Sequence, residues 1–315
     1  MCRIFGFKAT DSTNIRFSLA HAENALRVQS VTNPDGWGVG FYVNNDAKVI
    51  KRPISADSDY AFLQLSDIVS SDCVLAHVRK GSVGAVNTVN CHPFNYQQWL
   101  FAHNGTLEEA GNIQAKLAQT LAPQLKNNIL GSTDSEMCFH VILNILLQEF
   151  AVDLDNPDLS SRLVCTAVAA AICHMDNLSR KAGADYISRF NFVLTNGTFM
   201  LATRRGSDMY YLERYRQPDA VGMWANAEQR EGLDILLEED ADSAPRASVF
   251  VASEPITAEK WQEMPQDSCL IIDNQAKVDI FPMKTLDAEE ISTLESYIDM
   301  RMREAGLRPQ RPEEN

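Results

Sequence analysis

Hydrophobic positions along the chain follow two patterns that alternate in blocks. Short apolar runs typical of strands occur near residues 2–7, 37–43, 73–79 and 99–103, and again at 190–195, 198–203, 210–213, 248–252 and 269–281. Between the two blocks, apolar residues recur at helical spacing from about 107 to 182, with breaks expected near residues 131 and 156–157. This succession of strands, helices and strands predicts an α+β fold.

The chain carries one long apolar stretch and one predicted terminal helix. The stretch at 163–173 is well short of the roughly 20 residues that a membrane-spanning helix needs, so it predicts a buried core helix. Apolar residues at helical spacing predict a last helix over 287–305, with Gly306 as its C-cap. We therefore expect a single domain over 1–306, followed by a flexible tail at 307–315.

Composition and charge indicate an ordinary globular protein. The chain has 315 residues, of which 45% are hydrophobic and 22% charged. The net charge of −14 argues against nucleic acid or an anionic membrane as a partner, because both would repel an acidic surface. The seven cysteines are scattered without C-x-x-C spacing, so we expect neither a disulfide framework nor a metal site, and no cofactor. Without a charged leader before an apolar segment, the expected location is cytoplasmic.

The second residue is the strongest candidate for chemistry. Cys2 directly follows the initiator methionine, so removal of Met1 would place a thiol and an α-amine on one residue. Such an amine titrates at about 7.7 to 8.0 and accepts the thiol proton near neutral pH. Cys2 would then be nucleophile and base together, suited to attack on an amide or ester carbon. A lone cysteine is more often a small buried apolar residue, so this hypothesis needs support from other motifs.

Further motifs supply that support. They are 76–84 (AHVRKGSVG), 90–93 (NCHP), 101–105 (FAHNG) and 131–136 (GSTDSE). Together with the opening residues MCRIFGF, these motifs resemble the class II glutamine amidotransferases, which are N-terminal nucleophile hydrolases. The resemblance is greatest to the stand-alone members related to YafJ and to the γ-glutamyl hydrolases of ergothioneine and glutathione metabolism. It is specific over about 1–140 and implies a four-layer αββα sandwich of the N-terminal nucleophile hydrolase type.

Two charged residues suit the free amino acid end of a γ-glutamyl substrate. Arg79 offers a planar fork that pairs two-to-two with a carboxylate. Asp134 would accept the substrate ammonium, although its Ser-Thr-Asp-Ser-Glu run also predicts a helix N-cap with a capping box. The resemblance further implies that Gly81 and Ser82 lie in a loop around the bound substrate, where both residues also fit an ordinary turn.

The dipeptide Asn104-Gly105 allows two interpretations. It follows an apolar run, a context typical of a hairpin with no chemistry required. Asn196-Gly197 stands in the same context without catalytic neighbours, so a hairpin is a sufficient explanation there. For Asn104 and Gly105 the resemblance implies a further role, in which the side-chain amide and the glycine N–H form an oxyanion hole.

Other polar positions in these motifs give weaker signals. We expect His77, His92 and His103 to be packed or hydrogen-bonded near the site, because the α-amine already fills the role of base. Residues 35–38 (DGWG) predict a turn that enters a strand. Residues 251–257 (VASEPIT) predict a turn and a helix start, without a catalytic role.

The residues and the resemblance together favour a glutamine amidotransferase or glutaminase. Cys2 would attack the glutamine side-chain amide, ammonia would leave, and water would release glutamate from the thioester. The expected fold uses the whole chain, so any ammonia acceptor would be a separate subunit. A γ-glutamyl hydrolase that acts on a γ-glutamyl peptide or a thiol-containing amide is the alternative. A non-catalytic glutamine-sensing subunit is the third hypothesis, and retention of Met1 would favour it.

Overall fold

A computed structural model describes residues 2–81, 83–156, 159–215 and 246–283. The predicted last helix and the tail after it lie outside these described residues, and so do Met1 and Ser82. In the part of the chain that is described, no helix is both long enough and apolar enough to cross a bilayer.

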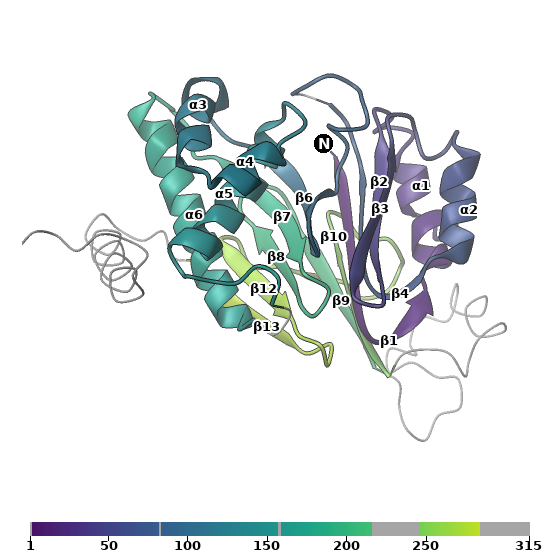
Figure 1. Cartoon of the computed structure of the whole chain (residues 1–315). Coiled ribbons are helices and arrows are strands. Elements are labelled where there is room, and N and C mark those ends of the chain that lie inside the picture. Colours follow the sequence, from purple (N-terminus) through teal and green to yellow (C-terminus); the bar gives the residue numbers. More distant parts are fainter. Residues whose placement is uncertain (1, 82, 157–158, 216–245, 284–315) are drawn as a thin grey trace, which may run out of the picture.

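Two antiparallel sheets form the centre of the molecule (Figure 1). The seven-stranded sheet has the order β11-β9-β10-β1-β4-β2-β3. Its strands are β1 (Arg3–Asn14), β2 (Trp37–Val43), β3 (Asp46–Arg52), β4 (Ser70–Val78), β9 (Tyr210–Tyr215), β10 (Ala247–Ala252) and β11 (Gln262–Glu263). The six-stranded sheet has the order β13-β12-β8-β7-β6-β5. Its strands are β5 (Phe94–Tyr96), β6 (Trp99–Thr106), β7 (Arg189–Thr195), β8 (Met200–Arg204), β12 (Ser268–Ile272) and β13 (Val278–Pro282).

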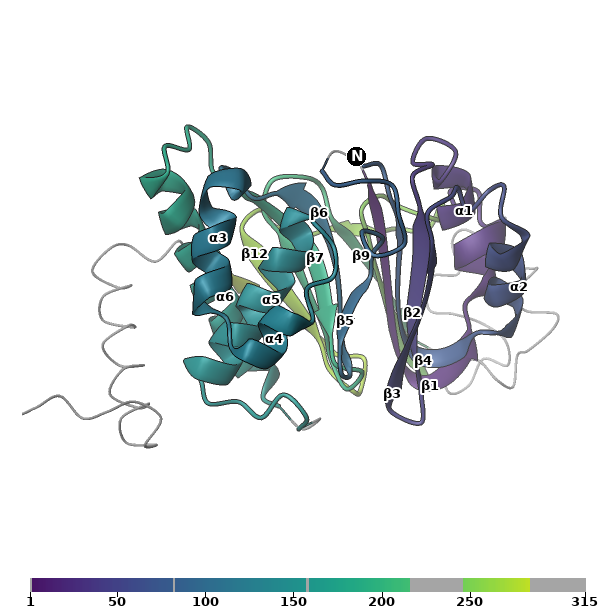
Figure 2. The ribbon, with the colours of Figure 1, turned by 45° about the horizontal axis from the view of Figure 1, so that its top comes forward.

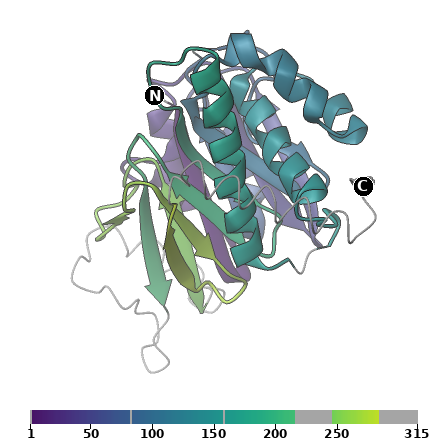
Figure 3. The same ribbon diagram turned by 90° about the vertical axis from the view of Figure 1, so that its left-hand side faces the viewer.

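Helices cover the outer face of each sheet (Figures 1 and 2). The six-stranded sheet is covered by α3 (Ala110–Thr120), α4 (Pro123–Asn127), α5 (Asp134–Gln148) and α6 (Ser161–Lys181). Figure 3, viewed from that side, shows these helices lying over the strands. The other sheet is covered by η1 (Phe17–His21), α1 (Leu26–Gln29) and α2 (Tyr60–Ile68). The sequence stretch at 163–173 lies within α6, much of which is buried, as predicted for a core helix.

Within the described residues, three hydrophobic cores separate the four layers. One fills the space between α3–α6 and the six-stranded sheet, the second lies under η1, α1 and α2, and the third lies between the sheets. Strand β1 contributes side chains to two of these cores, because successive side chains point to opposite faces of the sheet. Ile4 belongs to the core between the sheets, and Phe5 to the core under the helices. Cys2 therefore directly precedes a strand that is fixed from both faces.

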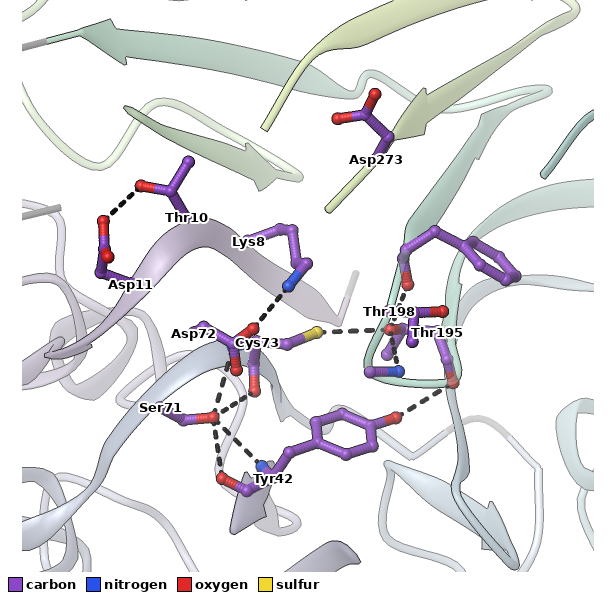
Figure 4. A network of polar contacts seen from close by, with 12 residues as sticks. Lys8, Thr10, Asp11, Tyr42, Ser71, Asp72, Cys73, Thr195, Thr198 and Asp273 are labelled. Atoms are coloured by element: carbon purple, nitrogen blue, oxygen red, sulfur yellow. Dashed lines mark hydrogen bonds and ion pairs between the residues drawn. The ribbon is translucent and has the colours of Figure 1, made fainter. Parts of the chain in front are cut away.

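A polar network ties the two sheets together away from the N-terminal end of β1 (Figure 4). The Tyr42 hydroxyl donates to the carbonyl oxygen of Thr195 at 3.2 Å, and the Cys73 sulfur lies 3.3 Å from the hydroxyl of the same threonine. Buried Lys8 pairs with Asp72 at 2.6 Å. By the strand registers, this network sits toward the opposite end of β4, β6 and β7 from His77, Asn104 and Arg189. The far end of the sandwich is thus closed by packing and hydrogen bonds.

Several elements differ from those that the hydrophobic pattern predicts. The run at 269–281 is two strands, β12 and β13, because residues 273–277 form a turn. Strand β1 continues beyond residue 7 to Asn14, although the added residues are mostly polar. The hydrophobic pattern does not predict edge strand β3 or surface helix α2, since β3 has alternating exposed and half-buried positions and α2 buries few residues.

Candidate active site

Cys2 presents its thiol at the start of β1. The Lys80 N–H donates to the sulfur at 3.1 Å, and the thiol lies 3.2 Å from the Lys80 carbonyl oxygen. Cys2 is half-buried, whereas the other six cysteines are buried. Burial raises the pKa of the Cys2 thiol above its ordinary value of 9.0, while the Lys80 N–H and the Arg79 charge act in the opposite direction. At neutral pH the sulfur is therefore a thiol, and it needs a base to become a nucleophile.

Asn104 lies directly against Cys2. Its side-chain nitrogen Nδ2 donates to the Cys2 carbonyl oxygen at 2.6 Å and to the Ser253 hydroxyl oxygen at 2.9 Å. Its oxygen Oδ1 lies 3.1 Å from Nε2 of His77. Because Nδ2 supplies both donors, Oδ1 must accept, and the network assigns the His77 proton to Nε2. One carboxamide thus connects Cys2, a buried histidine and a serine.

The hairpin interpretation is wrong for Asn104-Gly105. Both residues lie inside β6 and pair with β7, so the strand passes straight through the dipeptide. The interpretation is right for Asn196-Gly197, which connects β7 to β8 and gives Gly197 a φ of +93°. The two dipeptides share a local sequence context but differ in structure. Asn104-Gly105 stays extended because it pairs with β7, some 85 residues further along the chain.

Close packing restricts position 105 to glycine. An added Cβ would lie 2.0 Å from the Arg189 carbonyl oxygen and 2.3 Å from Nε2 of His103. A real Cβ does not approach backbone so closely, so any side chain here would push β6 away from β7.

Arg79 follows β4 and holds the loop after it. The side chain is only 3% exposed. Nη2 donates to the carbonyl oxygens of Val83 at 2.7 Å and Gly84 at 3.2 Å, and Nη1 donates to that of Ala85 at 3.4 Å. Both hydrogens of Nη2 are therefore used. A carboxylate that paired two-to-two with this guanidinium would have to displace part of these loop bonds.

The turn at Asp35-Gly36 fastens the same segment. The Arg79 N–H donates to the Gly36 carbonyl at 2.7 Å, and the Asp35 N–H donates to the Arg79 carbonyl at 3.0 Å. The Asp35 carboxylate accepts from the Gly81 N–H at 2.8 Å. The predicted turn into β2 is thus confirmed, and it also positions two candidate residues. Ser82, the neighbouring candidate, lies outside the described residues.

Asp134 is the first residue of α5 and faces the end of β6. Its Oδ2 accepts from the Leu107 N–H and its Oδ1 from the Ser135 N–H, both at 2.9 Å, and the residue is 8% exposed. The predicted helix start is confirmed, with Thr133 as the N-cap that accepts from the Glu136 N–H. These bonds join Asp134 to the segment that follows Asn104 and Gly105. Arg79 is connected to Cys2 through the backbone of its neighbour Lys80, and Asn104 is connected to it through the Cys2 carbonyl.

The Glu136 side chain does not complete the predicted capping box. Its carboxylate accepts from the N–H groups of Leu130 at 3.0 Å and Gly131 at 2.7 Å, rather than from the N-cap. The carboxylate thereby holds the turn that leads into α5. Gly131 is confined there, because an added Cβ would lie 2.3 Å from Oδ1 of Asn90.

Three histidines are buried behind the site, as expected. His103 bonds the Ser135 hydroxyl at 2.9 Å and the Arg189 carbonyl at 3.0 Å, and the rings of His77 and His92 lie 4.3 Å apart. Burial lowers the pKa of His77 to about 3 and the pKa of His92 well below 6.5, and it also lowers the pKa of His103. All three are neutral at physiological pH, so they act as hydrogen-bonding and packing groups.

Ser253 is a site residue that the sequence analysis misses. Its hydroxyl oxygen accepts from the Ile4 N–H at 2.9 Å as well as from Asn104, and its own N–H donates to the Ile4 carbonyl at 3.2 Å. Beside it, Glu254 pairs with Arg3 at 2.8 Å. Residues 253–254 form a bend after β10, and residues 253–260 start no helix, so the predicted helix start is wrong. A polar pair directly after a fully buried strand was the available signal.

Metal ligation finds no support in the described residues, where no three His, Cys, Asp or Glu side chains converge in a way that could hold an ion. The arrangement around Cys2 consists of a thiol, backbone amides and one side-chain amide. These groups suit covalent catalysis by a thiol with hydrogen-bond donors beside it.

Comparisons of sequence agree with this chemistry. The family model described as "Glutamine amidotransferases class-II" matches residues 1–294. The "Probable glutamine amidotransferase DUG3" of Saccharomyces cerevisiae is 26% identical over 300 residues, which cover 87% of this chain and 82% of that protein. The "Gamma-glutamyl-hercynylcysteine sulfoxide hydrolase" of Mycobacterium tuberculosis strain H37Rv is 27% identical over 224 residues, covering 68% of this chain and 81% of that protein.

Solved structures show the same fold. A glutamine aminotransferase class-II domain protein from Silicibacter pomeroyi superimposes with a TM-score of 0.59 at 20% identity, covering 89% of this chain and 99% of that one. The glutamine phosphoribosylpyrophosphate amidotransferase of Bacillus subtilis gives a TM-score of 0.54 at 14% identity, covering 90% of this chain and 49% of that one. The predicted sandwich of the N-terminal nucleophile hydrolase type is confirmed. By its match over residues 1–294, the chain belongs to the class II glutamine amidotransferases, a family of enzymes that act on glutamine or γ-glutamyl substrates.

Proposed function

We propose that this protein hydrolyses the side-chain amide of glutamine to glutamate and ammonia through a thioester on Cys2. One observation carries the proposal: a half-buried thiol at the start of β1 lies beside a buried carboxamide whose nitrogen faces the same residue. An acyl transfer needs a nucleophile and an oxyanion donor close together, and in this proposal Cys2 and Asn104 take these two roles.

The first step joins the Cys2 sulfur to the substrate carbonyl carbon. Removal of Met1 frees the α-amine of Cys2, which takes the thiol proton as the C–S bond forms. This base is necessary, because burial favours the protonated thiol. As the tetrahedral intermediate collapses, the α-ammonium returns the proton to the departing nitrogen and ammonia leaves. Water then attacks the thioester, the C–S bond breaks, and glutamate is released.

The oxyanion is stabilised by Asn104 and Gly105. The Nδ2–H of Asn104 that bonds the Cys2 carbonyl oxygen in this structure would exchange that acceptor for the carbonyl oxygen of the substrate as it gains negative charge, and the N–H of Gly105 would donate beside it. Loss of one such donor reduces the rate by about 10² to 10³. Support comes from the position of the Asn104 amide at Cys2 and from the close packing that keeps residue 105 free of a side chain.

The amino acid end of the substrate would be held by opposite charges. In this proposal Arg79 binds the α-carboxylate and Asp134 the α-ammonium, with Gly81 and Ser82 in the loop around the ligand. Arg79 is buried one residue from the Lys80 backbone that contacts Cys2, which supports its assignment. Because its Nη2 is engaged by Val83 and Gly84, substrate binding would involve a rearrangement of the loop.

A second candidate keeps the same site but changes the leaving group. The relative from Mycobacterium tuberculosis is named as a hydrolase of a γ-glutamyl compound. Glutamine and γ-glutamyl peptides share the end that Arg79 and Asp134 would hold, so a peptide or a thiol-containing amine could leave in place of ammonia. If ammonia is instead used for synthesis, we propose that a separate subunit accepts it.

The deciding experiment measures glutamate release from glutamine and from a panel of γ-glutamyl amides that includes glutathione. Wild type, Cys2→Ala and the control Cys173→Ala are compared, and mass spectrometry establishes whether Met1 has been removed. Release that disappears in Cys2→Ala and persists in Cys173→Ala supports the proposal, and the preferred compound identifies the leaving group. Unchanged turnover in Cys2→Ala, or no release from any compound by processed wild type, would overturn it.

A further inference from the structure

The Asn104 carboxamide can adopt two orientations that differ by a half-turn. In the observed one, Nδ2 faces the Cys2 carbonyl oxygen at 2.6 Å. The half-turn would put Oδ1 against that oxygen, so two acceptors would face each other and no N–H of the amide would point toward Cys2. The geometry of the proposed oxyanion donor therefore depends on whatever holds the amide in the first orientation.

His77 holds the oxygen side of the amide. It is fully buried on β4, where its backbone is paired with Ile4 on one side and Gly38 on the other. Its ring packs against the ring of His92, which in turn packs against Phe94. A neutral imidazole has a single N–H, and here it points from Nε2 to Oδ1 of Asn104 at 3.1 Å. The ring is thus a fixed donor that favours one orientation of the amide.

Ser253 holds the nitrogen side. Its hydroxyl oxygen accepts one Nδ2–H at 2.9 Å, and the serine itself is fixed to β1 by two bonds with the backbone of Ile4. Ile4 lies two positions after Cys2, so the serine ties the amide to the strand that carries the nucleophile. With this hydrogen on Ser253, the second Nδ2–H is the one that bonds the Cys2 carbonyl oxygen, and a substrate oxyanion would replace that oxygen as its acceptor.

We propose that His77 and Ser253 are positioning residues that fix the Asn104 carboxamide with one N–H directed at Cys2. This inference rests on the function proposed above. Neither residue needs to touch the substrate: His77 acts through Oδ1 and Ser253 through Nδ2. A hydrogen bond of this kind contributes about 0.5 to 1.5 kcal/mol, so its loss should reduce the rate by about 2- to 10-fold.

A double-mutant cycle tests the route through Asn104. Glutamate release is measured for wild type, Ser253→Ala, Asn104→Ala and the double variant, on the γ-glutamyl compound that wild type prefers. We expect Ser253→Ala to lower kcat by about 2- to 10-fold with KM little changed, and to have no further effect once Asn104 is alanine. Ser253→Thr keeps the hydroxyl and should recover most of the rate.

A second readout separates positioning from damage to the nucleophile. Alkylation of Cys2 by iodoacetamide displaces iodide from a saturated carbon and forms no oxyanion, so Ser253→Ala should alkylate at the wild-type rate. His77→Gln keeps one N–H donor and should retain more activity than His77→Leu, with thermal unfolding used to compare only folded proteins. If neither His77 variant folds, the Ser253 cycle alone decides.

The outcomes distinguish this inference from the function on which it rests. Full activity in Ser253→Ala, equal losses in the presence and absence of Asn104, or a parallel loss of alkylation would overturn the positioning role while wild-type turnover stands. A processed wild type that releases no glutamate from any γ-glutamyl compound would overturn both.

Discussion

The side-chain nitrogen of Asn104 lies 2.6 Å from the carbonyl oxygen of Cys2, across 102 positions of sequence. Strand β6 of one sheet carries the first residue, and the second precedes β1 of the other. The contact therefore bridges the two sheets of the sandwich. Any shift between the sheets at this end would move the amide relative to the thiol.

Replacement of Asn104 should separate catalysis from stability. If Asn104 is an oxyanion donor, as proposed, Asn104→Ala should reduce glutamate release by about 10²- to 10³-fold while alkylation of Cys2 continues. The matched control is Asn196→Ala, in the second Asn-Gly dipeptide. Asn196 accepts bonds from the backbone of its own turn, so its replacement should reduce stability by about 1 kcal/mol and leave the rate of the folded protein unchanged. Equal rate losses in both variants would contradict the assignment.

These two dipeptides also show how far local sequence predicts the structure. An apolar run followed by Asn-Gly is a hairpin signal, and it succeeds at 196–197. It fails at 104–105 because pairing with Asn191 and Phe190 keeps the strand extended, and no local rule contains that partner. Strands and helices with strong apolar patterns were predictable because the spacing of their own apolar residues sets which face is buried, without reference to a distant partner.

The candidate site was predictable for residues whose type implies a chemical role. It was less predictable for residues whose role depends on contacts made only in the folded protein. Cys2 and Asn104 could be named from the motifs, and the structure brings them together. Ser253 was missed because a polar pair after a buried strand is a weak signal on its own, and the serine makes its bonds to Ile4 and Asn104, which are far away in sequence. The attachment of Arg79 to the loop carbonyls likewise follows only from the folded backbone.

Arg79→Lys should loosen the loop that the arginine holds. A lysine has one ammonium in place of a planar fork and cannot bond the carbonyls of Val83, Gly84 and Ala85 in the same geometry. We expect faster amide hydrogen exchange across residues 83–90 and a higher KM for the γ-glutamyl substrate. Lys80→Ala is the control, because Lys80 contacts Cys2 through its backbone. Wild-type hydrogen exchange and wild-type KM in Arg79→Lys would count against the roles of Arg79 in holding the loop and in binding the substrate.

A ligand should change the same loop. If a substrate carboxylate pairs two-to-two with Arg79, one of the Nη2 bonds to Val83 or Gly84 must open. Hydrogen exchange on Cys2→Ala, with and without bound substrate, should then show altered protection within 83–90 and little change in the 196–197 turn. Saturating ligand without any change in this loop would exclude that binding geometry.

Asp134→Asn should affect both stability and binding. The carboxylate accepts two backbone N–H bonds with separate oxygens, and an asparagine keeps only one acceptor oxygen. We expect a loss of about 1 to 3 kcal/mol in the free energy of unfolding, together with a raised KM if the residue binds the substrate ammonium. Thr133→Ala is the control, because it weakens the same helix start through the N-cap alone. A KM that rises equally in both variants would assign Asp134 a structural role only.

Acid should destabilise the protein through its buried histidines. His77 titrates near 6.5 when the chain is unfolded and at about 3 when it is folded. Between these values the unfolded chain binds a proton that the folded chain does not, so the free energy of unfolding falls as the pH falls from 6.5 toward 3. The slope from one such histidine approaches about 1.4 kcal/mol per pH unit.

His77→Gln removes this titration and should flatten the dependence. Urea unfolding of wild type and variant is compared at pH 7.5, 5.5 and 4.5. Carboxylates contribute similarly to both proteins, so the difference between the two slopes isolates His77. We expect the variant to lose less stability on acidification, even if it is less stable at neutral pH. The slope of its unfolding free energy against pH should be smaller by the equivalent of close to one bound proton. Parallel slopes would mean that His77 takes up a proton within the folded protein, and a charged ring would then face Asn104.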